Sequence, residues 1–205
     1  SSGVPDFVDI DQDGDLDLII FEPPLPSTYG KERITFYENT STDIQQPKFS
    51  YSSETAPFGL MALESGSSMT FTDIDNDGAI EAFVGFKDGS IRFFENNSSD
   101  SSVPNFVLSS DSAPFGIHPV GEYAIPHFVD IDADGDLDLF IGLADGTTVF
   151  QRNISTDKAQ PSFVQQEGNE PFGLQDIGTR TAPFFVDVDL DGDLDAFIGD
   201  FHQKI

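Results

Sequence analysis

Short apolar runs separated by polar segments recur along the chain. Four of them occupy residues 18–21, 82–85, 139–142 and 196–199. Each run is rich in Ile, Val, Leu or Phe and shows no period of 3.6 residues, which is typical of β-strands rather than helices. The sequence therefore predicts an all-β protein without a helix of appreciable length.

The apolar runs belong to a longer repeat of about 57 residues. A nine-residue acidic stretch precedes each run, and the first aspartates of these stretches are 64, 57 and 57 residues apart: Asp9, Asp73, Asp130 and Asp187. Three further features keep the same spacing: an asparagine (Asn39, Asn96, Asn153), a proline two residues before a phenylalanine (Pro47, Pro104, Pro161), and a Pro-Phe-Gly triplet beginning at Pro57, Pro114 and Pro171. Repetition at a fixed period indicates one structural unit used several times.

One unit reads as four strands. In the third unit the first strand runs into the acidic stretch at residues 128–131, and the second leaves it at 137–143. The Ala-Asp-Gly turn at 144–146 is a hairpin signal before a third strand at 147–153. A polar connector then leads to a fourth strand at 162–165. Four strands with a glycine and aromatic signature are typical of a β-propeller blade.

The predicted fold is thus a β-propeller segment of about three and a half blades, with an acidic loop between the first and second strands of each. The blades are expected at residues 7–63, 71–120 and 128–177, with a partial blade at 185–205. Because closed propellers need about 4–8 blades, we expect the 205 residues to be a fragment of a larger propeller. The alternative is that two chains complete one ring.

Composition adds a strong negative charge to this picture. The chain has 37 Asp and Glu against 9 Lys and Arg, a net charge of −28, and no Cys. This balance argues against a nucleic-acid partner, which needs clustered positive charge, and the missing Cys excludes disulfides and thiolate metal sites. No apolar run is long enough to cross a bilayer. With 38% hydrophobic residues and 21 Phe, the chain has too much core material for a disordered acidic tail.

About half of the acids lie in the four repeated stretches. These nine-residue segments hold 5, 4, 5 and 5 acidic residues, 19 of the 37. Such crowding is repulsive without a counter-charge, and Ca²⁺, which takes 6–8 oxygen ligands, supplies one. The predicted ligands, including the backbone carbonyl of Ala79, are Asp9, Asp11, Asp13, Asp15, Asp17, Asp73, Asp75, Asp77, Ala79, Glu81, Asp130, Asp132, Asp134, Asp136, Asp138, Asp187, Asp189, Asp191, Asp193 and Asp195.

The loops differ from an EF-hand, which carries a bidentate Glu at position twelve between two helices. Position twelve holds apolar residues here, namely Ile20, Val84, Ile141 and Ile198. Glycine at position six permits the sharp turn. Position seven is expected to offer only its backbone carbonyl, which explains why Ala79 is tolerated there. We therefore predict about four Ca²⁺ sites, each joining two strands.

The Asp-x-Asp-x-Asp-Gly-x-x-Asp loop between two strands resembles the FG-GAP/VCBS repeat of integrin α-subunit propellers and many secreted bacterial proteins. The resemblance covers the whole chain, with Glu81 in place of the last Asp in the second loop. It implies an extracellular or cell-surface location and calcium loops that are structural rather than catalytic. It also implies a role in adhesion, recognition or scaffolding toward a protein or carbohydrate ligand.

Seven extra residues of the first unit lie between Glu22 and Arg33. Because successive hairpins alternate between the two ends of a blade, this insertion faces away from the acidic loops. The resemblance implies that this face meets ligands, and the insertion holds Tyr29, Lys31 and Arg33. The alternative is a neutral loop insertion.

No catalytic motif accompanies the repeats, so we expect a protein that is not an enzyme. His118, His127 and His202 fit no metal or triad motif and are interpreted as loop or surface residues. One alternative is a propeller belonging to a polysaccharide-degrading enzyme; another is a purely structural spacer. Asn39, Asn96, Asn97 and Asn153 stand in glycosylation sequons, but three recur at one blade position, which favours a turn-forming role.

Overall fold

The computed structural model describes residues 4–22, 33–43, 45–52, 57–61, 66–100, 102–168 and 170–200. Within these residues the chain forms three four-stranded antiparallel sheets and one two-stranded sheet, each in sequence order. The strands are β1 (Val4–Val8), β2 (Asp17–Glu22), β3 (Arg33–Asn39), β4 (Phe49–Tyr51), β5 (Gly66–Thr72), β6 (Glu81–Phe86), β7 (Ile91–Asn96), β8 (Phe106–Leu108), β9 (Ile125–Val129), β10 (Asp138–Gly142), β11 (Thr148–Asn153), β12 (Phe163–Gln165), β13 (Thr181–Val186) and β14 (Asp195–Asp200). The predicted four antiparallel strands per unit are therefore confirmed.

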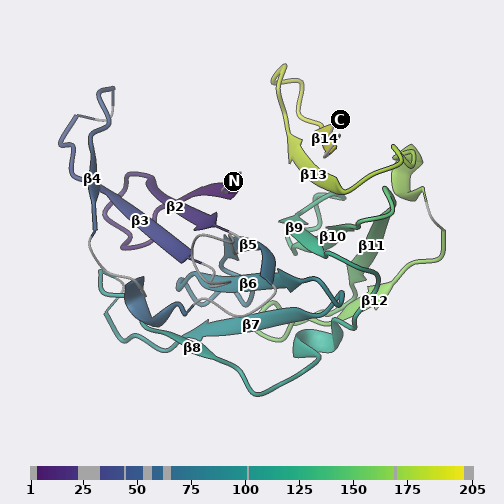
Figure 1. The fold of residues 1–205 in the computed structure, drawn as a ribbon, viewed down its shortest axis with the longest axis horizontal. Coiled ribbons are helices and arrows are strands. Elements are labelled where there is room, and N and C mark those ends of the chain that lie inside the picture. Colours follow the sequence, from purple (N-terminus) through teal and green to yellow (C-terminus); the bar gives the residue numbers. More distant parts are fainter. Residues whose placement is uncertain are drawn as a thin grey trace.

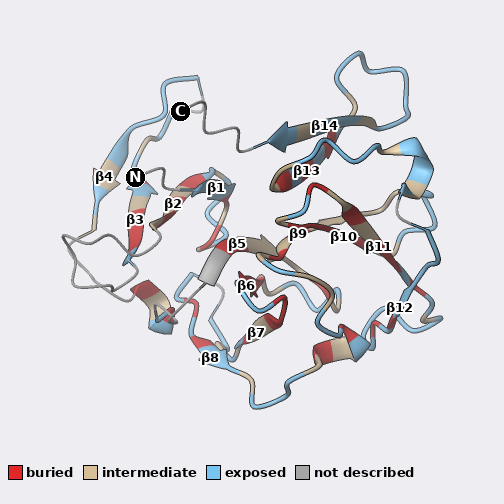
Figure 2. Ribbon diagram, turned by 45° about the vertical axis from the view of Figure 1, so that its right-hand side comes forward, coloured by how far each residue is buried: buried red, intermediate tan, exposed pale blue. Residues whose placement is uncertain are grey.

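The sheets follow one another around an arc (Figures 1 and 2). The first strand of each sheet lies against the first strand of the next, so β1 neighbours β5, β5 neighbours β9, and β9 neighbours β13. The first strands therefore line the inner side of the arc, and later strands lie progressively further out.

This connectivity gives the molecule two distinct faces. The acidic loops and the connectors between third and fourth strands lie on one, which we call the loop face. In the second and third sheets, the turns between second and third strands (87–90 and 143–147) lie on the other, the turn face, together with residues 120–124 and 177–181 that lead to the next sheet.

Each acidic loop is closed by the same strand pair. The residue before the first loop aspartate is paired with the acid at position nine in all four hairpins: Val8 with Asp17, Thr72 with Glu81, Val129 with Asp138, and Val186 with Asp195. The loops therefore begin and end at one register in every sheet.

The core consists of layers between consecutive sheets. One layer packs Phe21 and Phe36 of the first sheet against Val84 and Phe106 of the second. A second layer packs Phe83 against Leu139, and a third packs Phe140 against Phe185. Burying one such large apolar side chain contributes roughly 1.5–3 kcal/mol. Since neighbours bury both faces of β6, all six of its residues are buried, whereas β14 is mostly exposed (Figure 2).

Ring contacts repeat in these layers. The rings of Phe83 and Phe128 lie 4.5 Å apart, and those of Phe140 and Phe185 lie 4.4 Å apart, each pair joining two sheets. Within a sheet, the first-strand Phe also contacts the Phe that begins the fourth strand, as in Phe128 and Phe163 at 5.9 Å. The Pro-x-Phe signature thus supplies a core residue in the second and third units, Phe106 and Phe163, whereas Phe49 of the first unit is exposed.

The Pro-Phe-Gly triplets form three-residue 3₁₀ turns, η2 (Pro57–Gly59), η3 (Pro114–Gly116) and η4 (Pro171–Gly173). Their phenylalanines have φ between 53° and 55°, a left-handed conformation that is rare outside glycine. Each ring lies 5.0 Å from a third-strand Phe of its own sheet, namely Phe36, Phe93 and Phe150. We infer that this packing holds the backbone in a conformation which the sequence did not predict.

Helical segments of the described chain are far too short to cross a membrane.

Glycines at the end of the second strands allow the sheets to approach. A Cβ on Gly85 would lie 2.0 Å from the carbonyl oxygen of Ala124, and one on Gly142 would lie 2.1 Å from that of Thr181. The neighbouring backbones are hydrogen-bonded there, with the N–H of Thr181 donating to Leu143 O at 3.0 Å. In the last sheet the equivalent Gly199 has only Ala182 nearby, at 3.7 Å or more.

Replacing Gly142 by Ala should therefore destabilise the chain by roughly 1–3 kcal/mol, because the added methyl overlaps a backbone that cannot move independently. Gly199→Ala is the matched control, since the added methyl at the equivalent position makes only an ordinary van der Waals contact with Ala182. Urea unfolding monitored by circular dichroism would measure both. Equal midpoints for the two variants would contradict the close approach.

Candidate metal centres

Each acidic loop has the same backbone path. Position four has φ between 56° and 62° in Gln12, Asn76, Ala133 and Leu190, and position six is a glycine with φ between 88° and 100°. The glycine was predicted from the sequence. The left-handed residue at position four was missed, because only Asn76 is of a type that favours this conformation.

The carboxylate at position one organises this path. In the third loop Asp130 accepts the backbone N–H of Asp134 at 3.1 Å and that of Gly135 at 2.9 Å. The N–H of Asp136 then donates to the side chain of Asp134 at 3.0 Å. The position-six N–H donates to position one in every loop, through Gly14, Gly78, Gly135 and Gly192. The closely spaced loop carboxylates therefore also fix the turn, because they accept its backbone N–H groups.

The loops bring acidic oxygens together in sets of three. In each set, one ligand atom per residue lies within 4.8 Å of the others: Asp9, Asp11 and Asp13; Asp73, Asp75 and Glu81; Asp130, Asp132 and Asp134; Asp187, Asp189 and Asp191. Twelve of the predicted residues thus converge. These sets leave out Asp15, Asp17, Asp77, Asp136, Asp138, Asp193 and Asp195, and the backbone ligand predicted at Ala79 stays a prediction.

The second loop shows how Glu81 replaces aspartate. Its longer side chain reaches Asp73 and Asp75, where the other loops use the acid at position five. Its Oε2 also accepts the backbone N–H of Ile74 at 3.2 Å. The one departure from the loop pattern therefore still places an acidic oxygen in the cluster.

Several loop oxygens are buried and have no hydrogen-bond partner. They belong to Asp9, Asp11, Asp15, Asp17, Asp75 and Asp138, and the other such side-chain oxygen in the described chain is that of Gln151. A buried carboxylate oxygen without a donor is costly. A hard cation that prefers oxygen ligands would satisfy these atoms, so the loop residues fit Ca²⁺.

The acids at position nine connect the loops to the third strands. Asp17 and Asp138 are only 1% and 3% exposed. One oxygen of each accepts the backbone N–H at the end of the third strand, from Asn39 at 2.7 Å and Asn153 at 2.8 Å. The other oxygen is unpaired. Position nine is thus anchored on one side and open toward the loop on the other.

Burial raises the pKa of both Asp17 and Asp138 to about 6, and repulsion from neighbouring loop aspartates adds to the effect. Burial likewise raises the pKa of Glu81 to about 8, again with a contribution from loop aspartates. Without a metal, the folded chain therefore holds protons at Asp17, Asp138 and Glu81 more tightly than an ordinary carboxyl does.

A polar connector follows each of these anchored strands. The Oδ1 atoms of Asn39, Asn96 and Asn153 each accept two backbone N–H groups of the connector at 3.0–3.2 Å. Two residues later, Ser41, Ser98 and Ser155 donate to the carbonyls of Asp43, Asp100 and Asp157. The turn-forming role predicted for the asparagines is confirmed, and it explains why serine completes the sequon-like pattern.

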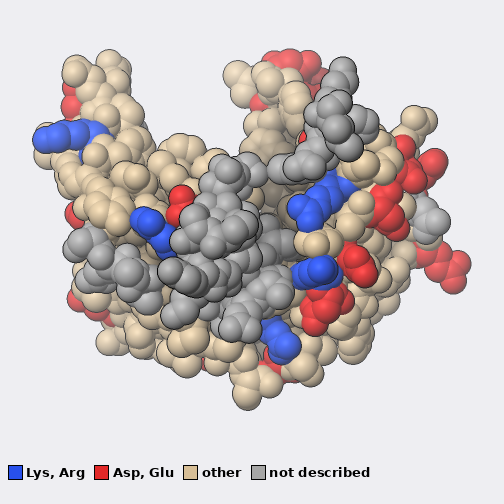
Figure 3. Space-filling model, viewed as in Figure 1, with Lys and Arg blue, Asp and Glu red and all other residues tan. Residues whose placement is uncertain are grey.

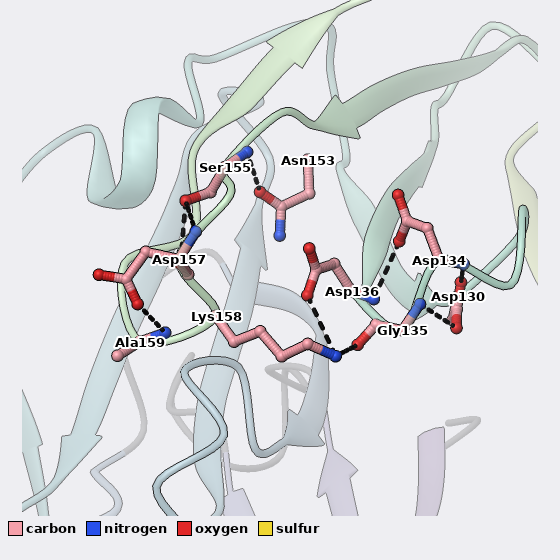
Figure 4. Close-up of polar contacts among 9 residues, drawn as sticks. All are labelled: Asp130, Asp134, Gly135, Asp136, Asn153, Ser155, Asp157, Lys158 and Ala159. Carbon is pink, nitrogen blue, oxygen red and sulfur yellow. Dashed lines mark hydrogen bonds and ion pairs between the residues drawn. The ribbon is translucent and has the colours of Figure 1, made fainter.

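The third loop also contacts two basic side chains, Lys158 and Arg152, and Figure 4 shows the contacts of Lys158. The ammonium of Lys158, which comes from the connector, donates to Gly135 O at 2.6 Å and lies 3.6 Å from the carboxylate of Asp136. The guanidinium of Arg152 pairs with Asp132. Lys158 also lines a cleft of about 290 Å³ between the second and third loops, together with Asp73, Asn76 and Asp130.

Other predicted residues lie apart from the loops. Arg33 and Glu22 form an ion pair of 3.5 Å where the first-unit insertion begins and ends, while Tyr29 and Lys31, like His202, fall outside the described residues. His127, expected in a loop or on the surface, instead lies in β9. Its ring packs on Phe184 and Phe185, and burial lowers its pKa.

The metal-free chain should lose stability as the pH rises. Carboxyls in the unfolded chain have pKa values near 4, so folding takes up protons at Asp17, Asp138 and Glu81. The stabilisation from these protonated groups is fully present below about pH 4 and is lost as the pH passes about 6 and then about 8. Urea unfolding of dialysed protein between about pH 5 and 8 would show the decline.

Asp6 must be separated from these groups, because burial also raises its pKa to about 6. An Asp6→Asn background removes it, and in that background Asp17→Asn together with Asp138→Asn should make the decline shallower and leave the part that Glu81 contributes. A slope unchanged by the two loop substitutions would contradict the assignment.

Residues 73–141 match the family described as FG-GAP-like repeat. The match begins at the first aspartate of the second loop and ends within β10, so it spans two acidic loops and the strands between them. No curated protein shows significant similarity to the chain. The resemblance carried by the loop pattern is thus confirmed over residues 73–141.

Proposed function

We propose that the chain is part of an extracellular β-propeller that about four Ca²⁺ ions stabilise, and that it serves in adhesion, recognition or scaffolding rather than catalysis. The observation that carries the proposal is the set of buried, unpaired oxygens at Asp9, Asp11, Asp17, Asp75 and Asp138. Position three is unpaired in the first and second units (Asp11, Asp75) and position nine in the first and third (Asp17, Asp138), within a loop geometry that all four units share.

The ligand chemistry favours calcium over other metals. The four acidic clusters contain only carboxylate oxygens, which suit Ca²⁺ and Mg²⁺ rather than the softer metals that bind sulfur or imidazole. Mg²⁺ usually uses one or two carboxylates and keeps several waters. Three converging acids in every loop therefore favour the larger ion.

The propeller part of the proposal rests on the arrangement of the sheets. Four sheets follow one another around an arc with their first strands innermost (Figure 2), as blades do around a propeller axis. The FG-GAP-like match covers the second loop through β10, and the other units share its loop path and strand order. In this proposal each Ca²⁺ joins the first and second strands of a blade.

A recognition role would use the turn face. There Tyr123 lies under the guanidinium of Arg180, 3.8 Å from its ring centre, and 5.5 Å from the ammonium of Lys87. In this proposal the two cations held at the ring pair with acidic groups of a protein or carbohydrate ligand. In the view of Figure 3, the Lys and Arg side chains of the described residues form separate groups among neutral and acidic ones. Together with the net charge of −28, this supports the absence of nucleic acid among the proposed partners.

A glycan array combined with a pull-down would separate recognition from a spacer role. Wild-type protein that binds a defined glycan or protein, and loses that binding in Tyr123→Ala, supports recognition through the turn face. Binding that Tyr123→Ala leaves intact would contradict it.

Removing calcium should lower the melting temperature, and adding it back should restore it. A site with a dissociation constant near 1 mM contributes about 1.4 kcal/mol at about 10 mM Ca²⁺. We expect EDTA to destabilise the chain and equimolar Mg²⁺ not to restore it, as measured by differential scanning fluorimetry. Asp11→Asn should reduce the response, whereas Glu167→Gln, outside the loops, should not. If neither EDTA nor added Ca²⁺ changes the melting temperature, metal binding is refuted.

A further inference from the structure

The first and third acidic loops form a natural matched pair. Their nine residues are identical except at position four, where Gln12 stands in one and Ala133 in the other. Both loops have a buried position-nine aspartate anchored to the third strand. Any difference in their metal affinity must therefore come mainly from the residues around them.

Those surroundings carry opposite charges. The residue before the third-strand asparagine is Glu38 in the first unit and Glu95 in the second, but Arg152 in the third. Lys158 is also particular to the third unit, because Ile44 and Ser101 stand at the equivalent positions.

Both basic groups act directly on the third loop. Arg152 pairs with Asp132, at position three, which belongs to the converging cluster. Lys158 contacts the carbonyl of Gly135 and the carboxylate of Asp136, at positions six and seven (Figure 4). Two positive charges therefore reach the loop from the third strand and from the connector.

We propose that Arg152 and Lys158 are built-in counterions of the third loop, which therefore binds Ca²⁺ more weakly than the first loop and depends less on it for its fold. This inference rests on the proposed calcium binding. An incoming ion must share the acids with two cations already in contact with them. One unit charge about 6 Å from a divalent ion changes its affinity about tenfold even at the dielectric constant of water. The first loop should thus fill at lower Ca²⁺ than the third.

The backbone amide resonance of the position-six glycine reports metal binding in each loop separately. Gly14 and Gly135 donate their N–H to the position-one carboxylates Asp9 and Asp130, so their resonances should respond to metal in their own loop. The test is a Ca²⁺ titration of the ¹⁵N-glycine-labelled 205-residue chain, followed by heteronuclear NMR. We expect the midpoint of Gly135 to lie at least about tenfold above that of Gly14.

Substitutions taken from the sister units then test the cause. Arg152→Glu with Lys158→Ser should lower the Gly135 midpoint at least about tenfold and leave that of Gly14 unchanged. The reverse change, Glu38→Arg, should raise the Gly14 midpoint alone. Loss of chemical-shift dispersion at Gly78 and Gly192 would show that the double variant unfolds. In that case the counterion role is tested by Lys158→Ser alone, which should lower the Gly135 midpoint, and by the wild-type comparison of Gly135 with Gly14.

The outcomes distinguish a failure of the proposed calcium binding from a failure of the counterion role. If no loop glycine responds to Ca²⁺, the proposed calcium binding is wrong. If Gly14 and Gly135 respond with equal midpoints that the substitutions do not change, calcium binding stands and the counterion role is wrong.

Discussion

Repulsion among closely held carboxylates is the constraint on which this structure depends. Three acidic residues in each loop place oxygens within 4.8 Å of one another, and two unit charges at that distance repel by about 3 kcal/mol at an effective dielectric constant of about 20. Backbone N–H groups at positions five, six and seven donate to the acids and fix them in place, as in the third loop. These hydrogen bonds offset only part of the repulsion, so the arrangement favours a bound cation.

In the first and third loops, the acid at position nine connects the crowded carboxylates to the strands of the sheet. Asp17 and Asp138 each hold the end of a third strand through a backbone N–H. From the same point an asparagine side chain organises the connector to the fourth strand. A charge placed in the loop is therefore coupled to the first, second and third strands and to the connector, which makes the loop part of the sheet rather than an appendage.

The sequence predicted the repeated features and missed those that need a spatial neighbour. Strands and loops followed from apolar runs, the glycine at position six and the acid spacing, all of them local. The left-handed phenylalanine of Pro-Phe-Gly was not predictable, because Phe disfavours that conformation and only the third-strand ring compensates. The roles of Gly142 and Lys158 depend on contacts 39 and 23 residues away along the chain, and no local pattern reports them.

The junctions between sheets also restrict how the units could be rearranged. Second and third sheets end their second strand in Gly85 and Gly142, which the backbone of the next sheet covers. The first sheet has buried Phe21 at that position, and β5 opposite it carries a register shift between Gly66 and Ser68. A chimera that duplicates the third unit would therefore recreate a compatible seam, whereas one that moves the first unit inward would place a phenylalanine where the next sheet requires a glycine. The repeats share one fold, but the side chains at the junctions between sheets differ, so the units cannot be exchanged freely along the chain.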